Sequence, residues 1–179
     1  TKTTEPVTHA GSEQNKSHYA VAALLTVSAL LLMSLVPGGP IENRDFSHIS
    51  PLVLTVFNIF LTVLGMGSLL LVPLALKKIR VSGLLAVAVG ISYLLVYLLD
   101  LFAIFPRTPS PMPIALLSIE IIGSMVAIPL VLAGLCLWRS APRDTASALR
   151  LSSRQLIVIS ALAVAIVVFA TLSAMHSAG

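Results

Sequence analysis

The chain has 179 residues, of which 57% are hydrophobic and 10% charged, and its formal net charge is +4. An average soluble domain has about 25% charged residues, so a soluble globular protein is excluded. The basic residues stand in clusters too short for a nucleic-acid-binding surface, and a single cysteine, Cys136, excludes an internal disulfide or an iron–sulfur cluster. The lipid bilayer is therefore the expected partner of most of the surface.

Five apolar runs follow one another along the chain after a polar segment, residues 1–17, that we predict to be a flexible cytoplasmic tail. A helix rises about 1.5 Å per residue and a bilayer core is about 30 Å thick, so each run could cross it. We predict an all-α, polytopic transmembrane bundle. Residues 18–176 form one domain and residues 177–179 a short outer tail. The predicted spans are about residues 19–36, 51–76, 81–105, 114–138 and 156–175.

The distribution of basic residues predicts the orientation. Nine of the eleven Lys and Arg residues lie in the N-terminal tail, in the turn at 77–80 and in the segment 139–154, whereas Arg44 and Arg107 lie on the other side. Short cytoplasmic loops carry the excess of Lys and Arg. We therefore predict a cytoplasmic N-terminus and an outer C-terminus, in a bacterial cytoplasmic (inner) membrane.

Three strongly polar residues, Asn58, Asp100 and Glu120, lie inside the predicted second, third and fourth spans. Such residues are costly in lipid and are rarely without a role. Counted from the outer ends of their spans, all three lie roughly 8–11 Å deep. Tyr97 lies one turn before Asp100. These four residues form the candidate intramembrane polar site.

Small residues share helix faces with the polar ones and predict close helix packing. The second to fourth spans should therefore form the core, with the first and fifth as flanking helices. The helix-packing candidates are Gly65, Gly90, Gly123, Ala127 and Gly134.

Two interpretations of the polar site are open. Two neighbouring carboxyl groups resist ionising together, so the site could carry a proton, bind a cation or recognise a polar headgroup. Alternatively, Asp100 or Glu120 is a protonated hydrogen-bonding link between helices, or Asp100 meets interfacial water or Arg107. The second interpretation has the greater weight on sequence alone.

The predicted outer loop carries Glu42, Asp45 and His48, spaced three residues apart. Carboxylate and imidazole groups could bind a metal ion, but a solvated loop with ordinary charges is the better interpretation. We expect no cofactor and no metal.

Motifs for phosphate binding or nucleophilic catalysis are missing, so we expect no catalysis. Three functions remain open. The first is a small accessory, assembly or interaction subunit, acting with a partner membrane protein or as a homo-oligomer. The second is a proton- or cation-coupled carrier or channel that uses Asn58, Asp100 and Glu120. The third, and least favoured, is a membrane-embedded enzyme acting on lipid.

Overall fold

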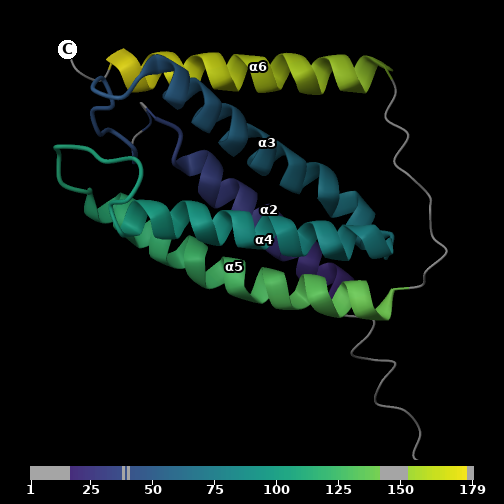
Figure 1. Cartoon of the computed structure of the whole chain (residues 1–179). Helices are drawn as coiled ribbons and strands as arrows, with labels where there is room; N and C mark the ends of the chain where they lie inside the picture. Colours follow the sequence, from purple (N-terminus) through teal and green to yellow (C-terminus); the bar gives the residue numbers. More distant parts are fainter. Residues whose placement is uncertain (1–16, 38, 40, 142–152, 177–179) are drawn as a thin grey trace, which may run out of the picture.

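The computed structural model describes residues 17–37, 39, 41–141 and 153–176. These residues form helices and loops, with no strand among them. The tails predicted at residues 1–16 and 177–179, and most of the basic segment 139–154, lie outside the described residues. Figure 1 shows five helices: α2 (Ser17–Ser34), α3 (Pro51–Leu76), α4 (Arg80–Leu101), α5 (Ile114–Ser140) and α6 (Ser153–His176).

Helices α2 to α5 pack together as a bundle, and α6 lies against α3 (Figure 1). Helix α2 contacts α3, α4 and α5, and its residues Val21, Leu25 and Ala29 are fully buried. The expectation that the first span is a flanking helix is therefore wrong. Its apolar residues have no polar stripe to mark a buried face, so only the tertiary packing places this helix in the core.

Helix α4 ends earlier than the sequence predicted, at Leu101 instead of residue 105. Ala103 adopts a left-handed conformation with φ 50°, and Ile104 N–H donates to the Leu99 carbonyl at 2.8 Å. This bond and the one from Ala103 N–H to the Asp100 carbonyl form a Schellman motif, which ends the helix. Asp100 therefore lies in the last turn of α4, shallower than predicted.

Helix α3 has the predicted bounds, and the remaining helices differ from prediction by one to three residues at their ends. Pro51 stands in the first turn of α3, where its missing N–H costs nothing.

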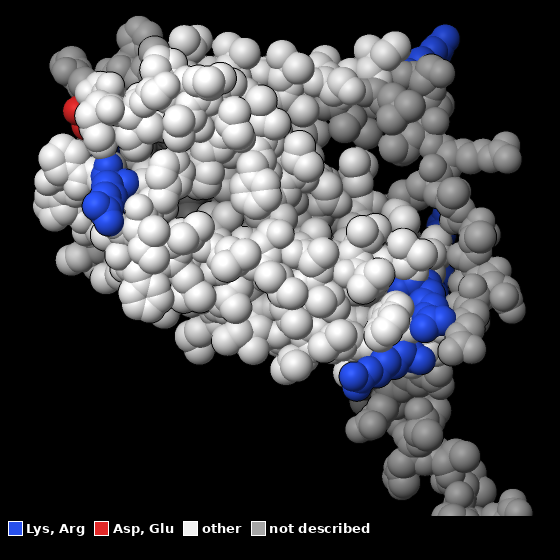
Figure 2. All heavy atoms as spheres, viewed as in Figure 1, with Lys and Arg blue, Asp and Glu red and all other residues white. Residues whose placement is uncertain are grey.

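The two ends of the bundle differ in charge. All four acidic residues of the described part belong to one end, which we call the acidic end; it comprises the loops 35–50 and 102–113 and the adjoining helix turns. The opposite, basic end carries five of the seven described basic residues, and Figure 2 shows most of the visible blue side chains gathered there. The acidic residues are Glu42, Asp45, Asp100 and Glu120; the basic residues at the basic end are Lys77, Lys78, Arg80, Arg139 and Arg154.

Four of the described helices, α2 to α5, are long and apolar enough to cross a membrane. Their outward faces expose large aliphatic side chains, among them Ile114 at 82% and Leu52 at 72%. Lipid-facing helices carry such surfaces because the hydrocarbon core offers nothing polar to contact. Helix α6 contains a shorter apolar stretch, Ser160–Ser173.

Glycines bring α4 and α5 into close contact. A Cβ atom added at Gly90 would lie 2.8 Å from the Val131 side chain, and one at Gly134 would lie 2.9 Å from the Gly83 carbonyl oxygen. Gly83, which the sequence did not single out, thus belongs to the same seam. Of the other packing candidates, Ala127 is fully buried, Gly65 faces Leu32 of α2, and Gly123 faces the Tyr97 ring.

Candidate functional site

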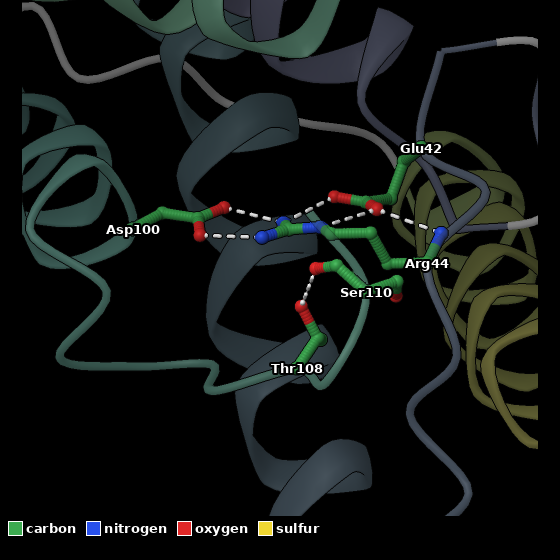
Figure 3. A network of polar contacts seen from close by, with 5 residues as sticks. All are labelled: Glu42, Arg44, Asp100, Thr108 and Ser110. Atoms are coloured by element: carbon green, nitrogen blue, oxygen red, sulfur yellow. Dashed lines mark hydrogen bonds and ion pairs between the residues drawn. The ribbon is translucent and has the colours of Figure 1, made fainter. Parts of the chain in front are cut away.

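A buried ion-pair network joins the loop 35–50 to the end of α4 at the acidic end. The Arg44 guanidinium donates from Nη1 and Nη2 to the two carboxylate oxygens of Asp100, at 2.8 and 2.6 Å. It also donates from Nε and Nη2 to the two oxygens of Glu42, at 2.9 and 2.6 Å. Figure 3 shows the guanidinium lying between both carboxylates. All three residues are less than 10% exposed, so the network is shielded from solvent.

Local contacts hold Arg44 in this position. Its guanidinium lies 5.5 Å from the centre of the Phe46 ring, and Phe46 packs with Leu54 at the start of α3. Burial disfavours the charged guanidinium, but the hydrogen bonds and charges of Glu42 and Asp100 outweigh that effect and raise the pKa of Arg44. Arg44 is therefore a permanent cation fixed between two carboxylates.

Beside this network lies a cavity, which we call the polar chamber, with about 50 Å³ of space for water-sized molecules. That volume holds a few water molecules or one small ion, whereas sites for drug-sized ligands measure about 300–1,000 Å³. All four bundle helices and both loops of the acidic end contribute to its wall. The lining residues are Leu32, Leu35, Pro37, Glu42, Arg44, Phe46, Leu54, Phe57, Asn58, Leu61, Val96, Tyr97, Asp100, Pro106 and Glu120.

The structure places all four residues of the candidate polar site in the wall of this chamber. Asn58 comes from α3, Tyr97 and Asp100 from α4, and Glu120 from α5. Asn58 also donates from Nδ2 to the Thr171 hydroxyl of α6 at 3.1 Å. Three helices distant in sequence thus present polar groups to one volume.

Two of these groups have unused hydrogen-bonding capacity. Glu120 is 2% exposed and Tyr97 1% exposed. Within the described residues, Glu120 Oε2 and the Tyr97 hydroxyl have no hydrogen-bond partner. A buried polar atom without a partner costs roughly 1–3 kcal/mol, so an unexplained one deserves a functional explanation.

Tyr93, one turn before Tyr97, differs from it because its hydroxyl group has a hydrogen-bond partner. Its hydroxyl lies 2.9 Å from Ser68 Oγ, and Ser68 Oγ donates its proton to the Leu64 carbonyl. Tyr93 is therefore the donor to Ser68. The two tyrosine rings are stacked with their centres 6.1 Å apart, yet only the hydroxyl at the chamber lacks a partner.

The three candidates of the loop 35–50 make separate contacts. Glu42 pairs with Arg44, Asp45 accepts a hydrogen bond from Ser47 N–H at 2.8 Å, and His48 Nε2 lies 2.6 Å from the Arg107 carbonyl oxygen. The hydrogen bond from Ser47 lowers the pKa of Asp45. In the described segments, no group of three His, Cys, Asp or Glu residues could hold a metal ion. The expectation of a solvated loop is wrong for Glu42, which is buried with its cation.

Arg44 is the site residue that sequence reasoning missed. Its counter-ion Asp100 was matched with Arg107 or water, because Arg107 is closer along the chain. A weak signal was available: Arg44 stands two residues after Glu42, and the C-terminal end of a helix disfavours a negative charge, so a cation beside Asp100 is favourable. The pairing itself spans 56 residues, which no local pattern encodes.

The charges around the chamber do not balance. Three carboxyl groups, those of Glu42, Asp100 and Glu120, surround the single guanidinium of Arg44. The guanidinium is already bound to two of them, whereas Glu120 has no cationic partner among the described residues. The arrangement favours a positively charged occupant, or a proton on Glu120.

Comparison with known proteins gives one match. A family model described as "Domain of unknown function (DUF8051)" matches residues 17–149. This region contains α2 to α5 and every residue of the polar chamber, and it ends before α6. No curated protein and no solved structure matches the chain significantly.

Proposed function

We propose a function for this chain, which belongs to the family of the domain of unknown function DUF8051: it is an integral membrane protein that binds a small cation or a proton in the polar chamber. The observation that carries this proposal is Glu120, a buried carboxyl group with a partnerless oxygen in the chamber wall. Carboxylates of this kind mark ion pathways and proton relays in membrane proteins, and their oxygens can replace water around an entering cation.

The chamber is suited to reversible occupancy. Arg44 compensates one of the two negative charges of Glu42 and Asp100, so the wall has one uncompensated charge when Glu120 is protonated and a second when Glu120 is ionised. One carboxylate with a tyrosine hydroxyl and the Asn58 amide can coordinate a small ion without holding it permanently. The network keeps the wall in place whether the chamber is filled or empty.

If the chamber binds a cation, the folded protein should become more stable as the cation concentration rises, up to a limit at which the site is full. We expect ammonium chloride, but not choline chloride at equal ionic strength, to raise the melting temperature of the purified full chain in detergent. A ligand that binds only the folded state at about 100 times its dissociation constant adds about 2.7 kcal/mol. Thermal unfolding followed by size-exclusion chromatography measures the shift.

Glu120→Gln should remove this ammonium-dependent shift, because the amide keeps the volume but loses the negative charge. Asp45→Asn is the matched control: it removes a carboxylate at the same end that does not line the chamber. The shift should persist in this variant. An equal shift in Glu120→Gln, or no shift in the unaltered protein, would contradict the proposal.

The exposed apolar face of α6 favours a second function, that of an accessory or assembly subunit. This helix lies outside the family match and exposes apolar side chains such as Ile157, Val164 and Phe169 at 58–67%. A partner membrane protein or a second copy could pack on this face. Absence of cation binding together with a stable co-purifying partner would favour this function.

We further propose that α6 is a fifth span, that the N-terminus is cytoplasmic, and that the acidic end faces outward. The charge difference between the two ends supports this orientation. In a Cys136→Ser background, a cysteine at the exposed Ser47 should react with a membrane-impermeant maleimide added to intact cells. A cysteine at Lys77 should react only after lysis, and the reverse pattern would contradict the orientation.

A further inference from the structure

An apolar groove adjoins the polar chamber. It runs between α2, α3 and α6. Like the chamber it has about 50 Å³ of space for water-sized molecules, and about 450 Å³ when the open side is included. Five residues line both volumes: Leu32, Leu35, Pro37, Asn58 and Leu61. The groove and the chamber are therefore neighbours that share a wall.

The two volumes differ in chemistry. Beyond the shared residues, the groove is lined by apolar or small side chains, including Met33, Met66, Ile166 and Ala170, with Thr62 as the polar exception. Methionine side chains adapt to flexible apolar ligands. The chamber, by contrast, presents the excess carboxylate charge and the partnerless Glu120 oxygen.

From this juxtaposition we propose that the site binds a cationic amphiphile, a single-chain primary alkylammonium whose headgroup enters the polar chamber and whose chain lies in the groove. This proposal rests on the proposed function and names the class of cation. A primary ammonium offers three N–H donors, which match Glu120 Oε2, the Tyr97 hydroxyl and the Asn58 side-chain oxygen. The carboxylates disfavour an amphiphile with an anionic headgroup.

The alkyl chain of the amphiphile supplies affinity that a small cation lacks. Each buried CH₂ group contributes about 0.8 kcal/mol on transfer from water. A ligand dissolved in the bilayer gains less, because lipid is already apolar, but it arrives concentrated and oriented with its headgroup near the acidic end. The proposed ligand spans the two volumes at the five residues that line both.

The test measures binding of dodecylamine to the full-length protein in phosphatidylcholine nanodiscs by native mass spectrometry. Ethylamine, which has the headgroup without the long alkyl chain, tests the chamber alone. Dodecanol, which has the alkyl chain without the charge, tests the groove alone. We expect dodecylamine to bind about tenfold or more tightly than either probe. Glu120→Gln should abolish the preference for dodecylamine over dodecanol. Such results would support an occupant that uses charge and chain together.

The groove is tested separately by Gly65→Leu, which places a large side chain in its wall. We expect this variant to weaken dodecylamine binding about tenfold while leaving the ethylamine affinity unchanged. Gly65→Ala is a first control, since its Cβ would lie 3.6 Å from Leu32 in ordinary contact. Gly67→Leu adds the same side chain to the same helix away from the groove and should change binding less than about twofold.

The outcomes separate this proposal from the proposed function. If ethylamine binds as tightly as dodecylamine and both need Glu120, the small-cation site stands and the amphiphile proposal is overturned. If dodecanol binds as well as dodecylamine, or Gly65→Leu leaves dodecylamine binding intact, the amphiphile proposal is also overturned. If neither amine binds, the amphiphile proposal is overturned, and the ammonium-dependent melting shift with its Glu120→Gln variant decides the proposed function separately.

Discussion

Arg44→Gln is expected to destabilise the protein by about 3–5 kcal/mol, which is the usual cost of removing one partner from a buried ion pair. The substitution leaves Glu42 and Asp100 buried at 5% and 8% exposure without their shared cation. It also releases the loop 35–50 from α4, because the two hydrogen bonds from Arg44 to Asp100 are lost together with the two to Glu42. Reversible unfolding in mixed micelles, with sodium dodecyl sulfate as denaturant, measures the change.

Arg107→Gln is the matched control, since Arg107 lies at the same end with an exposed side chain. Its loss should change stability by less than about 0.5 kcal/mol.

The triple variant Glu42→Gln, Arg44→Met, Asp100→Asn removes all three charges together. It should be more stable than Arg44→Gln, because uncharged replacements of a buried network are often close to neutral. Equal stability of Arg44→Gln and Arg107→Gln would show that the network does not hold the loop.

Gly83→Ala is expected to destabilise the bundle by about 1–3 kcal/mol, the usual cost of overpacking. The added Cβ would lie 2.5 Å from the Trp138 backbone nitrogen and 2.8 Å from the Gly134 carbonyl oxygen. Both are backbone atoms of α5, so no side-chain rotation can relieve the clash and the two helices must separate. Separation would also disturb the hydrogen bond from Arg80 Nε to the Trp138 carbonyl, now 3.1 Å.

Gly67→Ala is the control for this substitution, because a Cβ there meets nothing within 4 Å. It should be neutral or stabilising by up to about 1 kcal/mol, since alanine is the better helix former. The same micelle unfolding assay compares both variants. A Gly83→Ala protein as stable as Gly67→Ala would mean that the α4–α5 contact is looser than the structure describes.

The depths of Asn58, Asp100 and Glu120 in their helices show which structural features neighbouring residues in the sequence can predict. Asn58 and Glu120 were placed on their helices by counting from Pro51 and Pro113, because prolines mark helix starts reliably. Asp100 was placed too deep, because the end of α4 depends on the left-handed Ala103. An alanine in that conformation carries no sequence signal of the kind that glycine gives.

The sequence by itself determined the all-helical class, the number of helices and the segregation of basic residues, because apolar run length and charge position are properties of consecutive residues. It also identified the polar helix residues of the chamber wall, Asn58, Tyr97, Asp100 and Glu120, since a polar residue in an apolar run stands out without any partner. The tertiary structure alone decided that α2 belongs to the core, that Gly83 closes the α4–α5 seam, and that Arg44 is the counter-ion of Asp100. Each of these depends on contacts between helices or between a loop and a helix, such as Leu32 with Gly65, Gly83 with Gly134 and Arg44 with Asp100, which form only when helices pack.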